Sequence, residues 1–339
     1  MSHLLPHTKI TGTGSYLPAH CESNLQITQR LAKLGIETSE EWIQSRTGIT
    51  QRYIAAANEY TSDLAVQAAQ QALLAAQLTA SDIDLIIVAT TTPDSIFPSV
   101  ACTVQNKLGL LHHVKMRGAA FDVQAVCSGF IYALTTANAL IKQGIASKAL
   151  VIGAETLTSI INWQDRNTCV LFGDGAGAVV LEASETAGIL ACKIHADGSL
   201  NSILNAPARV HQGLIEGNPF LYMDGQAVFK QAVTVLTDVA HEVCEAAHFD
   251  LSTLDWLIPH QANVRILSSV GKRLGIPETN IIVTVPQHAN TSAASVPLAL
   301  DTAIRDGRIQ SGHSVMLQGV GGGFTWGAVL LKINKDFIL

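Results

Sequence analysis

The chain has 339 residues, 14% of them charged and 48% hydrophobic, and its formal net charge is −6. This acidic balance excludes the broad basic surface with which proteins bind nucleic acid, and no uninterrupted apolar run approaches the roughly 20 residues that a membrane-spanning helix needs. Charged residues make up about 25% of an average soluble domain, so their low share here favours a surface that is partly covered by a second subunit.

The cysteines and the first residues indicate the compartment. The N-terminal segment M-S-H-L-L-P-H-T-K-I lacks the apolar core of a secretion signal. No two cysteines form a C-x-x-C pair, which favours reduced thiols in the cytoplasm over a disulfide framework or a zinc site. The cysteines are Cys21, Cys102, Cys127, Cys169, Cys192 and Cys244.

In chain order, the first clear elements are a helix and a strand. Residues 61–78 keep their apolar side chains on one face, which predicts an amphipathic helix capped by Thr61 or Ser62. Residues 84–90 are typical of a buried strand, and a loop with prolines follows at 92–98. Short β-branched runs alternate with Ala-rich stretches along the chain, which predicts α/β layers with buried strands.

The second half of the sequence repeats the pattern of the first. The repeat is expected to place equivalent strand ends around a shared cleft, because open α/β sheets bind ligands at the carboxyl ends of their strands. Three ordered matches indicate a duplicated unit joined near residues 183–198, although buried strands also resemble one another by chance. The segments from Ser81, Ala149 and Ala176 match those from Ser252, Val315 and Trp326, at offsets of 171, 166 and 150 residues.

Cys127 is the first candidate for chemistry. In F-D-V-Q-A-V-C-S-G-F, a strand at 119–123 leads into Cys127 and a buried helix follows. Unpaired N–H groups and the helix dipole near a helix N-terminus lower the pKa of a thiol from about 8.5. We therefore expect Cys127 to be a nucleophile suited to thioester exchange. A buried structural cysteine is the alternative, and it is the favoured interpretation for the other five.

His260 and Asn290 are two further candidates. In D-W-L-I-P-H-Q-A-N a short strand ends at His260 and a helix follows. In V-T-V-P-Q-H-A-N-T-S-A-A-S a strand is expected to lead to Asn290, before a helix of small residues. Taken singly, a core histidine and a helix-capping asparagine would be the preferred interpretations. Because Cys127, His260 and Asn290 share the same placement after a strand, they are candidates for one site.

A run of glycines at 319–327, G-V-G-G-G-F-T-W-G, follows the apolar strand V-M-L. Consecutive glycines allow the backbone to approach a ligand closely and to aim a free N–H group at an oxyanion. No Lys and Ser/Thr follow at the spacing of a phosphate-binding loop. The early segment G-T-G-S-Y-L, at 12–17, lacks the third glycine of a dinucleotide site.

Together these segments resemble β-ketoacyl-acyl carrier protein synthase III, the initiating condensing enzyme of bacterial fatty-acid synthesis. The resemblance extends from Ile10 to about Leu331 and includes E-W-I-Q-S-R-T-G-I, F-G-D-G-A-G-A and P-H-Q-A-N. It implies a thiolase-type fold with two duplicated α/β halves in a layered α-β-α-β-α arrangement. Residues 1–185 would carry the nucleophilic cysteine, and residues 186–339 the histidine and the asparagine.

The resemblance also implies the reaction and its partners. An acyl group from acyl-coenzyme A, acetyl by default, would join malonyl-acyl carrier protein with loss of carbon dioxide. The enzyme would be a cytoplasmic homodimer that uses coenzyme A thioesters as substrates and needs no metal or other cofactor.

Each matched position receives a role from the resemblance. Cys127 would be the acylated nucleophile and His260 and Asn290 the rest of the triad, while the backbone N–H groups of Cys127 and Gly322 would form an oxyanion hole. Trp42 and Arg166 would stack on the adenine of coenzyme A, although Trp42 taken alone could equally be a core residue. The other matched positions are Arg46 and Gly225 along coenzyme A, then Phe97, Leu157 and Phe172 around the acyl group, with the Phe97 position reaching across the dimer.

The helix after His260 offers a basic face. Arg265, Lys272 and Arg273 are seven and eight residues apart, so they lie on one side of a helix. Arg265 also matches a position implicated in docking the carrier protein, and a basic face suits that acidic partner. The alternative is that Lys272 and Arg273 only complement the helix dipole.

Two positions depart from the family pattern. Val320 stands where related sequences often carry an aromatic residue that packs near the histidine, so the orientation of His260 is open. Ala289 stands before Asn290 where glycine is common, and alanine restricts φ.

Other functions are also compatible with a cysteine, a histidine and an asparagine in this order. A cysteine hydrolase would use the same order of Cys, His and Asn. A biosynthetic thiolase would need a second catalytic cysteine near the C-terminus, and a plant-type polyketide synthase would repeat the extension. A non-catalytic acyl-binding or scaffold protein is the alternative that is not an enzyme.

Overall fold

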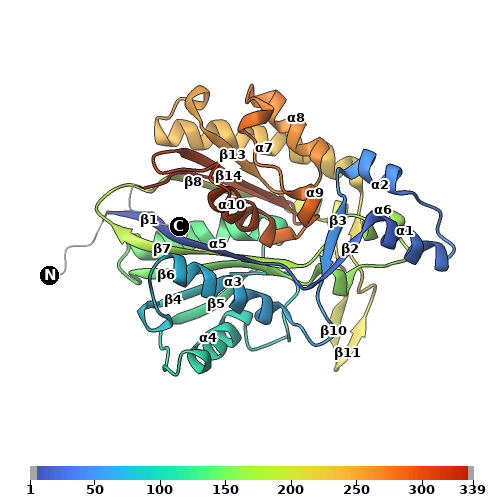
Figure 1. The fold of residues 1–339 in the computed structure, drawn as a ribbon, viewed down its shortest axis with the longest axis horizontal. Helices are drawn as coiled ribbons and strands as arrows, with labels where there is room; N and C mark the ends of the chain where they lie inside the picture. The colour runs from blue at the N-terminus through green and yellow to red at the C-terminus, as the bar shows by residue number, and fades with distance from the viewer. Residues whose placement is uncertain (1–5, 335–339) are drawn as a thin grey trace.

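The computed structural model describes residues 6–334, which form five layers in the order α-β-α-β-α (Figure 1). Two sheets lie nearly face to face, with helices between them and on both outer sides. The layered α/β arrangement predicted from the sequence is therefore confirmed. Among the described residues, no helix is both long and apolar enough to cross a membrane.

The first sheet has five strands in the order β1-β7-β6-β4-β5. β4 runs parallel to β5 and β6, whereas β7 is antiparallel to both of its neighbours. The strands are β1 (His7–Tyr16), β4 (Leu85–Ala89), β5 (Ala119–Val123), β6 (Lys148–Glu155) and β7 (Gly175–Ser184).

The second sheet repeats four of these five strands. Its order is β13-β14-β15-β8, with β13 and β14 parallel and the other pairs antiparallel. The matched sequence segments correspond to β4 and β13, β6 and β14, and β7 and β15, which occupy equivalent places in the two sheets. The strands are β8 (Ile189–Ala196), β13 (Trp256–Pro259), β14 (Ser314–Gly321) and β15 (Thr325–Lys332). The chain changes sheet between β7 and β8; the division at residue 185 stays a prediction.

Two helices fill the space between the sheets and form the main core. The inner helices are α5 (Gly129–Lys142) and α10 (Ser295–Arg305). α10 approaches its strand closely because a glycine stands at the contact: a Cβ on Gly177 would lie 2.6 Å from the backbone nitrogen of Leu298. The outer helices are α3 (Thr61–Ala75) and α4 (Val100–Leu111) on the first sheet, with α7 (Gly225–Ala247) and α8 (Val264–Leu274) on the second.

The remaining elements gather at one end of the layers (Figure 1). They are β2 (His20–Ser23), α1 (Asn24–Lys33), α2 (Glu40–Thr47), β3 (Gln51–Ile54), α6 (Arg166–Cys169), β9 (Leu204–Asn205), β10 (Arg209–His211), β11 (Leu214–Glu216), β12 (Tyr222–Met223) and α9 (Val285–His288). Short 3-10 turns connect the elements at Ala80–Asp82, Val126–Ser128, Leu157–Ile160, Gly198–Ile203, Leu251–Thr253, Glu278–Asn280 and Ser292–Ala294.

Two sequence predictions need correction. α3 ends at Ala75 because Gln77 takes a left-handed conformation with φ of 56°, and its first turn is held by the Asp63 carboxylate, which accepts from the N–H of Tyr60, rather than by Thr61 or Ser62. The strand predicted before Asn290 is wrong, because that segment forms the one-turn helix α9. There the side chain of Gln261 accepts from the N–H groups of Thr284 and Val285.

Candidate active site

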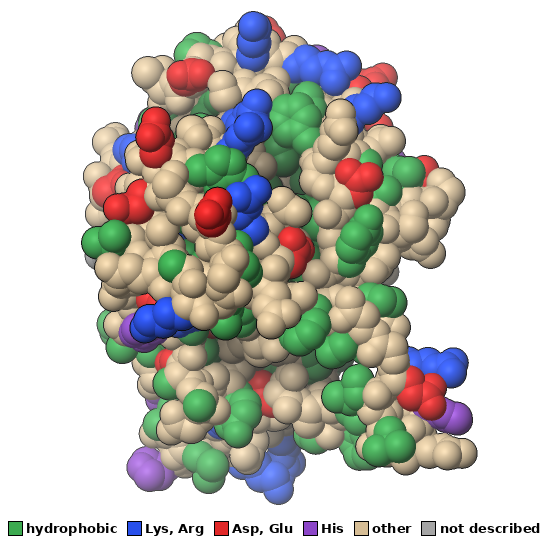
Figure 2. Space-filling model, turned by 90° about the vertical axis from the view of Figure 1, so that its right-hand side faces the viewer, with side chains coloured by type: hydrophobic (Ala, Val, Ile, Leu, Met, Phe, Trp, Pro, Cys, Tyr) green, Lys and Arg blue, Asp and Glu red, His purple; other side chains and the backbone are tan. Residues whose placement is uncertain are grey.

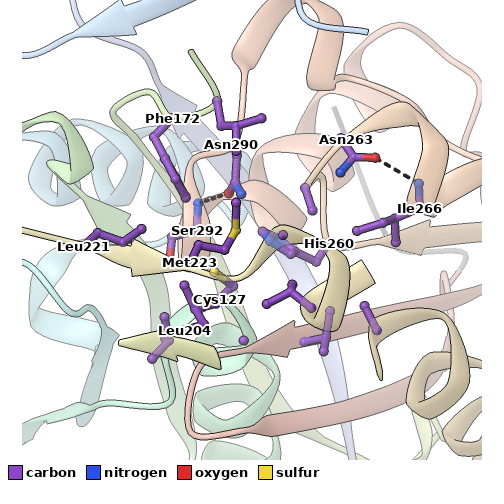
Figure 3. Close-up of a pocket in the computed structure, with 18 of the residues that line it drawn as sticks. Cys127, Phe172, Leu204, Leu221, Met223, His260, Asn263, Ile266, Asn290 and Ser292 are labelled. Atoms are coloured by element: carbon purple, nitrogen blue, oxygen red, sulfur yellow. Dashed lines mark hydrogen bonds between the residues drawn. The ribbon is translucent and has the colours of Figure 1, made fainter. Parts of the chain in front are cut away.

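The three candidate residues line one cavity of about 770 Å³ where the two halves meet (Figure 3). Cys127 lies in the turn between β5 and α5, His260 directly follows β13, and Asn290 lies between α9 and α10. Their side chains surround the same space in the close-up view. The folding of distant segments has therefore brought together a thiol, an imidazole and a carboxamide.

Cys127 is held in a crowded turn at the entrance to α5. Its side chain is only 5% exposed, and a Cβ on Gly321 would lie 2.5 Å from its backbone nitrogen, so only glycine fits there. Burial raises the pKa of the Cys127 thiol to about 12, and the charge of Glu155 acts in the same direction. Burial therefore opposes the lowering of this pKa that was expected from the helix N-terminus, because it removes the thiolate from water.

Glu155 is a functional candidate that sequence reasoning missed. This carboxylate ends β6 and is fully buried, and desolvation raises its pKa. One of its oxygens accepts from the hydroxyl groups of Ser292, at 3.0 Å, and Thr91, at 2.9 Å. Its other oxygen accepts from the hydroxyl of Thr92 at 2.5 Å. A carboxylate directly after an apolar strand was the available signal, since such a charge is rarely buried without a purpose.

His260 presents one ring nitrogen to the protein and the other to the cavity. Its Nδ1 lies 2.7 Å from the hydroxyl oxygen of Ser295, and its backbone N–H donates to the carbonyl of Gln318 at 2.8 Å. Burial lowers the pKa of the imidazole to about 3, so the ring is neutral at physiological pH. Nε2 has no hydrogen-bond partner among the described residues and is available to a substrate.

Asn290 is fixed through its backbone and its side-chain oxygen. Its N–H donates to the carbonyl of Leu171 at 2.9 Å, and its carbonyl accepts from the N–H of Gly173 at 3.1 Å. Its Oδ1 accepts from the backbone N–H of Ser292 at 2.9 Å, which is the dashed line between these two residues in Figure 3. The Nδ2 group has no acceptor within the described part of the chain, so Asn290 offers an N–H donor to the cavity.

The backbone around the site is strained at three positions. Val126, Ala289 and Ser292 have φ of 48°, 59° and 49° although none of them is glycine. Each is next to or within two residues of Cys127 or Asn290. Such conformations persist only where the surrounding structure enforces them, and they concentrate at functional sites.

The residues matched to coenzyme A contacts lie at the cavity mouth. Trp42, Arg46 and Gly225 line the cavity. Arg166 does not line it, but its guanidinium stacks on the Trp42 ring at 4.5 Å from the ring centroid and donates to the carbonyl of Glu37 at 2.8 Å. The planar guanidinium of Arg166 and the indole of Trp42 therefore provide two flat surfaces at the mouth of the cavity.

The acyl-pocket residues divide into two groups. Leu157 and Phe172 are buried and line the cavity. Phe97 does not line the cavity of its own chain, because its side chain is 82% exposed on the loop before α4. Further apolar residues line the cavity. Leu204, Leu221 and Met223 come from short strands and a loop that no periodicity marks, and Val228 and Phe229 come from the start of α7. Val320 also lines it, buried beside Phe324.

The glycine run contributes differently from the prediction. Gly321 lines the cavity next to Cys127, whereas Gly322 is not among the lining residues and packs against the carbonyl of Leu204. An oxyanion role for the Gly322 N–H stays a prediction.

A basic face adjoins the mouth. Arg265 is exposed and lines the cavity from α8, and Lys272 and Arg273 are exposed in the last turn of that helix. The face in Figure 2 shows Lys and Arg side chains gathered across its top and a hollow bordered by apolar side chains near its centre.

The other cysteines lie elsewhere. Of the six, only Cys127 lines the cavity, and Cys244 is buried in α7 within the core of the second half. Among the described residues, no three His, Cys, Asp or Glu side chains are grouped as metal ligands.

Comparison with known proteins identifies the family. The models for 3-oxoacyl-[acyl-carrier-protein] synthase III and for its C-terminal part match residues 121–198 and 244–333. The crystal structure of 3-oxoacyl-[acyl-carrier-protein] synthase III from Aquifex aeolicus VF5 is 44% identical with a TM-score of 0.88, and the match covers 96% of this chain and 99% of that one. The corresponding synthase from Thermus thermophilus is 40% identical with a TM-score of 0.86, over 96% and 98% of the two chains.

A third match is the synthase III FabH from Pseudomonas aeruginosa PAO1, which is 38% identical with a TM-score of 0.89 over 98% of this chain and 99% of that one. These likenesses extend over nearly the whole length and agree with the thiolase-type architecture. The chain therefore belongs to the 3-oxoacyl-[acyl-carrier-protein] synthase III family of condensing acyltransferases.

Proposed function

We propose that this chain joins an acyl group from acyl-coenzyme A to malonyl-acyl carrier protein, with loss of carbon dioxide, and so begins fatty-acid synthesis. The observation that carries the proposal is the convergence of Cys127, His260 and Asn290 on one cavity. Within it, a nucleophilic sulfur faces two neutral side chains that each have a polar nitrogen free for substrate.

In the first half-reaction, the Cys127 sulfur attacks the thioester carbonyl of acyl-coenzyme A. Backbone N–H groups of Cys127 and Gly322 hold the oxyanion, and one such donor typically contributes about 3 kcal/mol to the stability of the transition state. The C–S bond to coenzyme A then breaks, and the departing thiolate takes up one proton for the one that Cys127 loses. The acyl group remains on Cys127 as a thioester.

In the second half-reaction, malonyl-acyl carrier protein takes the place of coenzyme A. N–H groups of His260 Nε2 and Asn290 Nδ2 donate to the malonyl thioester oxygen and stabilise the enolate as carbon dioxide leaves. The enolate carbon attacks the acyl carbonyl, and the bond to Cys127 sulfur breaks. The departing Cys127 thiolate takes up a proton from solvent, so the products are a 3-oxoacyl-acyl carrier protein, carbon dioxide and the free cysteine, and no metal takes part.

The hydrogen bonds at the site disfavour a cysteine hydrolase. In such an enzyme asparagine orients histidine, and histidine deprotonates cysteine. Here the orienting partner of His260 is Ser295, whereas the Asn290 amide oxygen is bonded to the N–H of Ser292. A biosynthetic thiolase is disfavoured because a second cysteine is missing from the cavity lining.

The residues at the mouth of the cavity support the proposal that acyl-coenzyme A and malonyl-acyl carrier protein bind there. The stacked pair of Trp42 and Arg166 would open to hold adenine, with Arg46 and Gly225 along the rest of coenzyme A. Leu157 and Phe172 would contact the acyl group. The exposed Arg265, Lys272 and Arg273 would bind the acidic carrier protein.

We also propose that the protein works as a homodimer in the cytoplasm. The low proportion of charged residues supports a covered surface. The exposed Phe97 supports a contact that a second copy would complete.

The test is single-turnover labelling with radiolabelled acetyl-coenzyme A, followed by malonyl-carrier protein and mass spectrometry of the products. Wild-type protein should form a stoichiometric acyl-enzyme and then a ketoacyl product. Cys127→Ala should form no acyl-enzyme, while His260→Ala and Asn290→Ala should acylate but lose decarboxylation. Stoichiometric labelling of Cys127→Ala, or free acid as the main product, would refute the proposal. Offering several acyl-coenzyme A primers in competition would then define the acyl preference.

A further inference from the structure

A neutral imidazole has two tautomers, and the hydrogen bonds around His260 select which ring nitrogen carries the hydrogen. We propose that Ser295 holds His260 in the tautomer with hydrogen on Nε2, so that the imidazole is a permanent N–H donor to the cavity. This inference deepens the proposed function and rests on the role given there to His260. Ser295 would be a positioning residue, since it acts on substrate only through the ring.

The hydroxyl group of Ser295 is buried and has two hydrogen-bond partners among the described residues. Its side chain is 2% exposed at the first residue of α10, so bulk water does not satisfy its hydroxyl group. The hydroxyl oxygen lies 2.7 Å from Nδ1 of His260 and 3.3 Å from the backbone nitrogen of Gln261. Within the described part of the chain, these are its two hydrogen-bond partners.

Donor and acceptor capacity then fix the direction of each bond. The N–H of Gln261 can only donate, so the Ser295 oxygen accepts there. The hydroxyl hydrogen needs an acceptor, and Nδ1 of His260 is the one within reach. If Nδ1 carried the hydrogen, the serine oxygen would accept twice and its own hydrogen would be buried unpaired. That penalty favours the Nε2–H tautomer by roughly tenfold to a hundredfold.

The same short segment sets the second donor. The backbone N–H of Ser292 occupies Oδ1 of Asn290, which turns the Nδ2 group toward the cavity. Ser292 is itself held by its hydroxyl, which donates to the buried Glu155 at 3.0 Å. Residues 290–295 therefore orient both side chains as donors, which suits a developing enolate oxygen.

A donor-only histidine has a consequence for the order of events. With hydrogen on Nε2 and Nδ1 engaged by Ser295, neutral His260 has no free lone pair for the Cys127 proton. Loss of Ser295 should therefore damage enolate formation and leave acyl transfer to Cys127 nearly intact. A hydrogen bond with a merely structural role would affect the two steps together.

The first measurement is nitrogen-15 NMR of histidine-labelled wild-type enzyme at pH 7 without substrate. The chain has 12 histidines, and the His260 signals are those absent from the spectrum of His260→Gln. We expect a hydrogen-bearing Nε2 and an unprotonated Nδ1. A hydrogen-bearing Nδ1 in the wild type would overturn the proposal, whatever the variants do.

The second measurement compares variants. Ser295→Ala should give a mixture of His260 tautomers and slow malonyl decarboxylation about tenfold to a hundredfold, the size of the tautomer preference that is lost, with the acyl-enzyme burst retained. Ser295→Thr, which keeps the hydroxyl, should restore most of the rate. Ser314→Ala is the matched control, because Ser314 is 6% exposed and bonds Asp255 at the start of β14, away from the cavity.

Equal loss of burst and decarboxylation in Ser295→Ala would refute the positioning role, as would a wild-type rate. Failure of the proposed function looks different. In that case the wild-type enzyme would show no acyl-enzyme or no decarboxylation, while the tautomer of His260 would still be read from its NMR signals.

Discussion

At the scale of single residues, Cys127 shows how burial and helix position oppose each other. A helix N-terminus stabilises a nearby thiolate, but Cys127 lies in a 3-10 turn ahead of α5 with its sulfur removed from water. Burial raises the pKa of the thiol to about 12. The resting enzyme should therefore hold a thiol, and the proton should leave as the acyl group is attacked.

This state can be tested by alkylation with iodoacetamide between pH 6 and 10, read by mass spectrometry of the cysteine peptides. Because the thiolate is the reactive form, labelling of Cys127 should be slow at pH 7 and should still rise at pH 10. The exposed Cys102 is the internal comparison for reagent quality. A labelling rate of Cys127 that levels off below pH 8 would contradict the raised pKa.

Ala289 is a second residue at which local chemistry opposes the fold. Its φ of 59° and ψ of −165° belong to a region that is essentially restricted to glycine, and its methyl group is buried among Ile49, Leu267 and Val285. Strain of up to about 3 kcal/mol outweighs the methyl burial and backbone entropy, about 1.5 kcal/mol together, that favour alanine over glycine. Ala289→Gly should therefore raise the free energy of unfolding by about 1 kcal/mol.

Urea denaturation of wild-type and variant protein measures this difference. Ala294→Gly is the control, since Ala294 is equally buried but has an ordinary φ of −75°. The control should lose about 1–2 kcal/mol of stability. Similar losses in both variants would show that Ala289 carries no net strain.

At the scale of elements, the site depends on turns that follow buried strands. The sequence predicted β4, β5 and α8 well because their apolar patterns are strong and glycine, proline or polar residues flank them. It also placed Cys127 and His260 correctly after strands. These signals are local, so a single sequence is sufficient to read them.

Other parts of the site could not be predicted in this way. The segment before Asn290 has the β-branched residues of a strand, but a buried side chain, Gln261, satisfies its backbone N–H groups in place of a neighbouring strand. Leu204 reaches the cavity only through tertiary packing, and Glu155 is joined to the site only through its hydrogen bond with Ser292. The pKa of Cys127 likewise depends on burial, which spacing along the chain does not reveal.

The basic end of α8 gives a prediction at this scale. Lys272→Glu with Arg273→Glu should raise the KM for malonyl-carrier protein about tenfold, because charges at the rim of an interface act mainly on association. The acyl-enzyme burst from acetyl-coenzyme A should be unchanged, since these side chains lie outside the cavity lining. Steady-state kinetics at two salt concentrations measure both quantities.

Lys142→Glu at the end of α5 is the control for net charge, because it lies on a different helix and is exposed. If that variant weakens carrier-protein use as much as the α8 pair does, total charge rather than the α8 face is responsible. An unchanged KM in the α8 variant would mean that Lys272 and Arg273 serve the helix dipole alone.

At the scale of the whole molecule, duplication explains where the site lies. Each half supplies a sheet, the second repeating four of the five strands of the first, and the turns after β5 and β13 meet at the same cavity. The first half contributes Cys127, the proposed nucleophile, and the second half contributes His260 and Asn290, the two proposed donors. One edge of the first sheet is β5, which pairs only with β4 among the described strands.

The free edge of β5 and the exposed loop before α4 predict a homodimer. An unpaired edge strand invites pairing with another chain, and Ile96 and Phe97 are 77% and 82% exposed on that loop. Sedimentation velocity at micromolar concentration should therefore give twice the chain mass of 36.0 kDa. Phe97→Asp should shift the protein toward monomer, because a charge in an apolar contact is costly to bury.

Leu74→Asp separates a dimer contact from a general effect of surface charge. Leu74 is 79% exposed on α3, so its substitution adds the same charge at a similarly exposed apolar position. Leu74→Asp should remain dimeric and active, whereas Phe97→Asp should lose both dimer and acyl transfer if the partner's loop completes the acyl pocket. A monomeric wild-type protein with full activity would instead mean that one chain contains the entire site and that Phe97 is an ordinary exposed side chain.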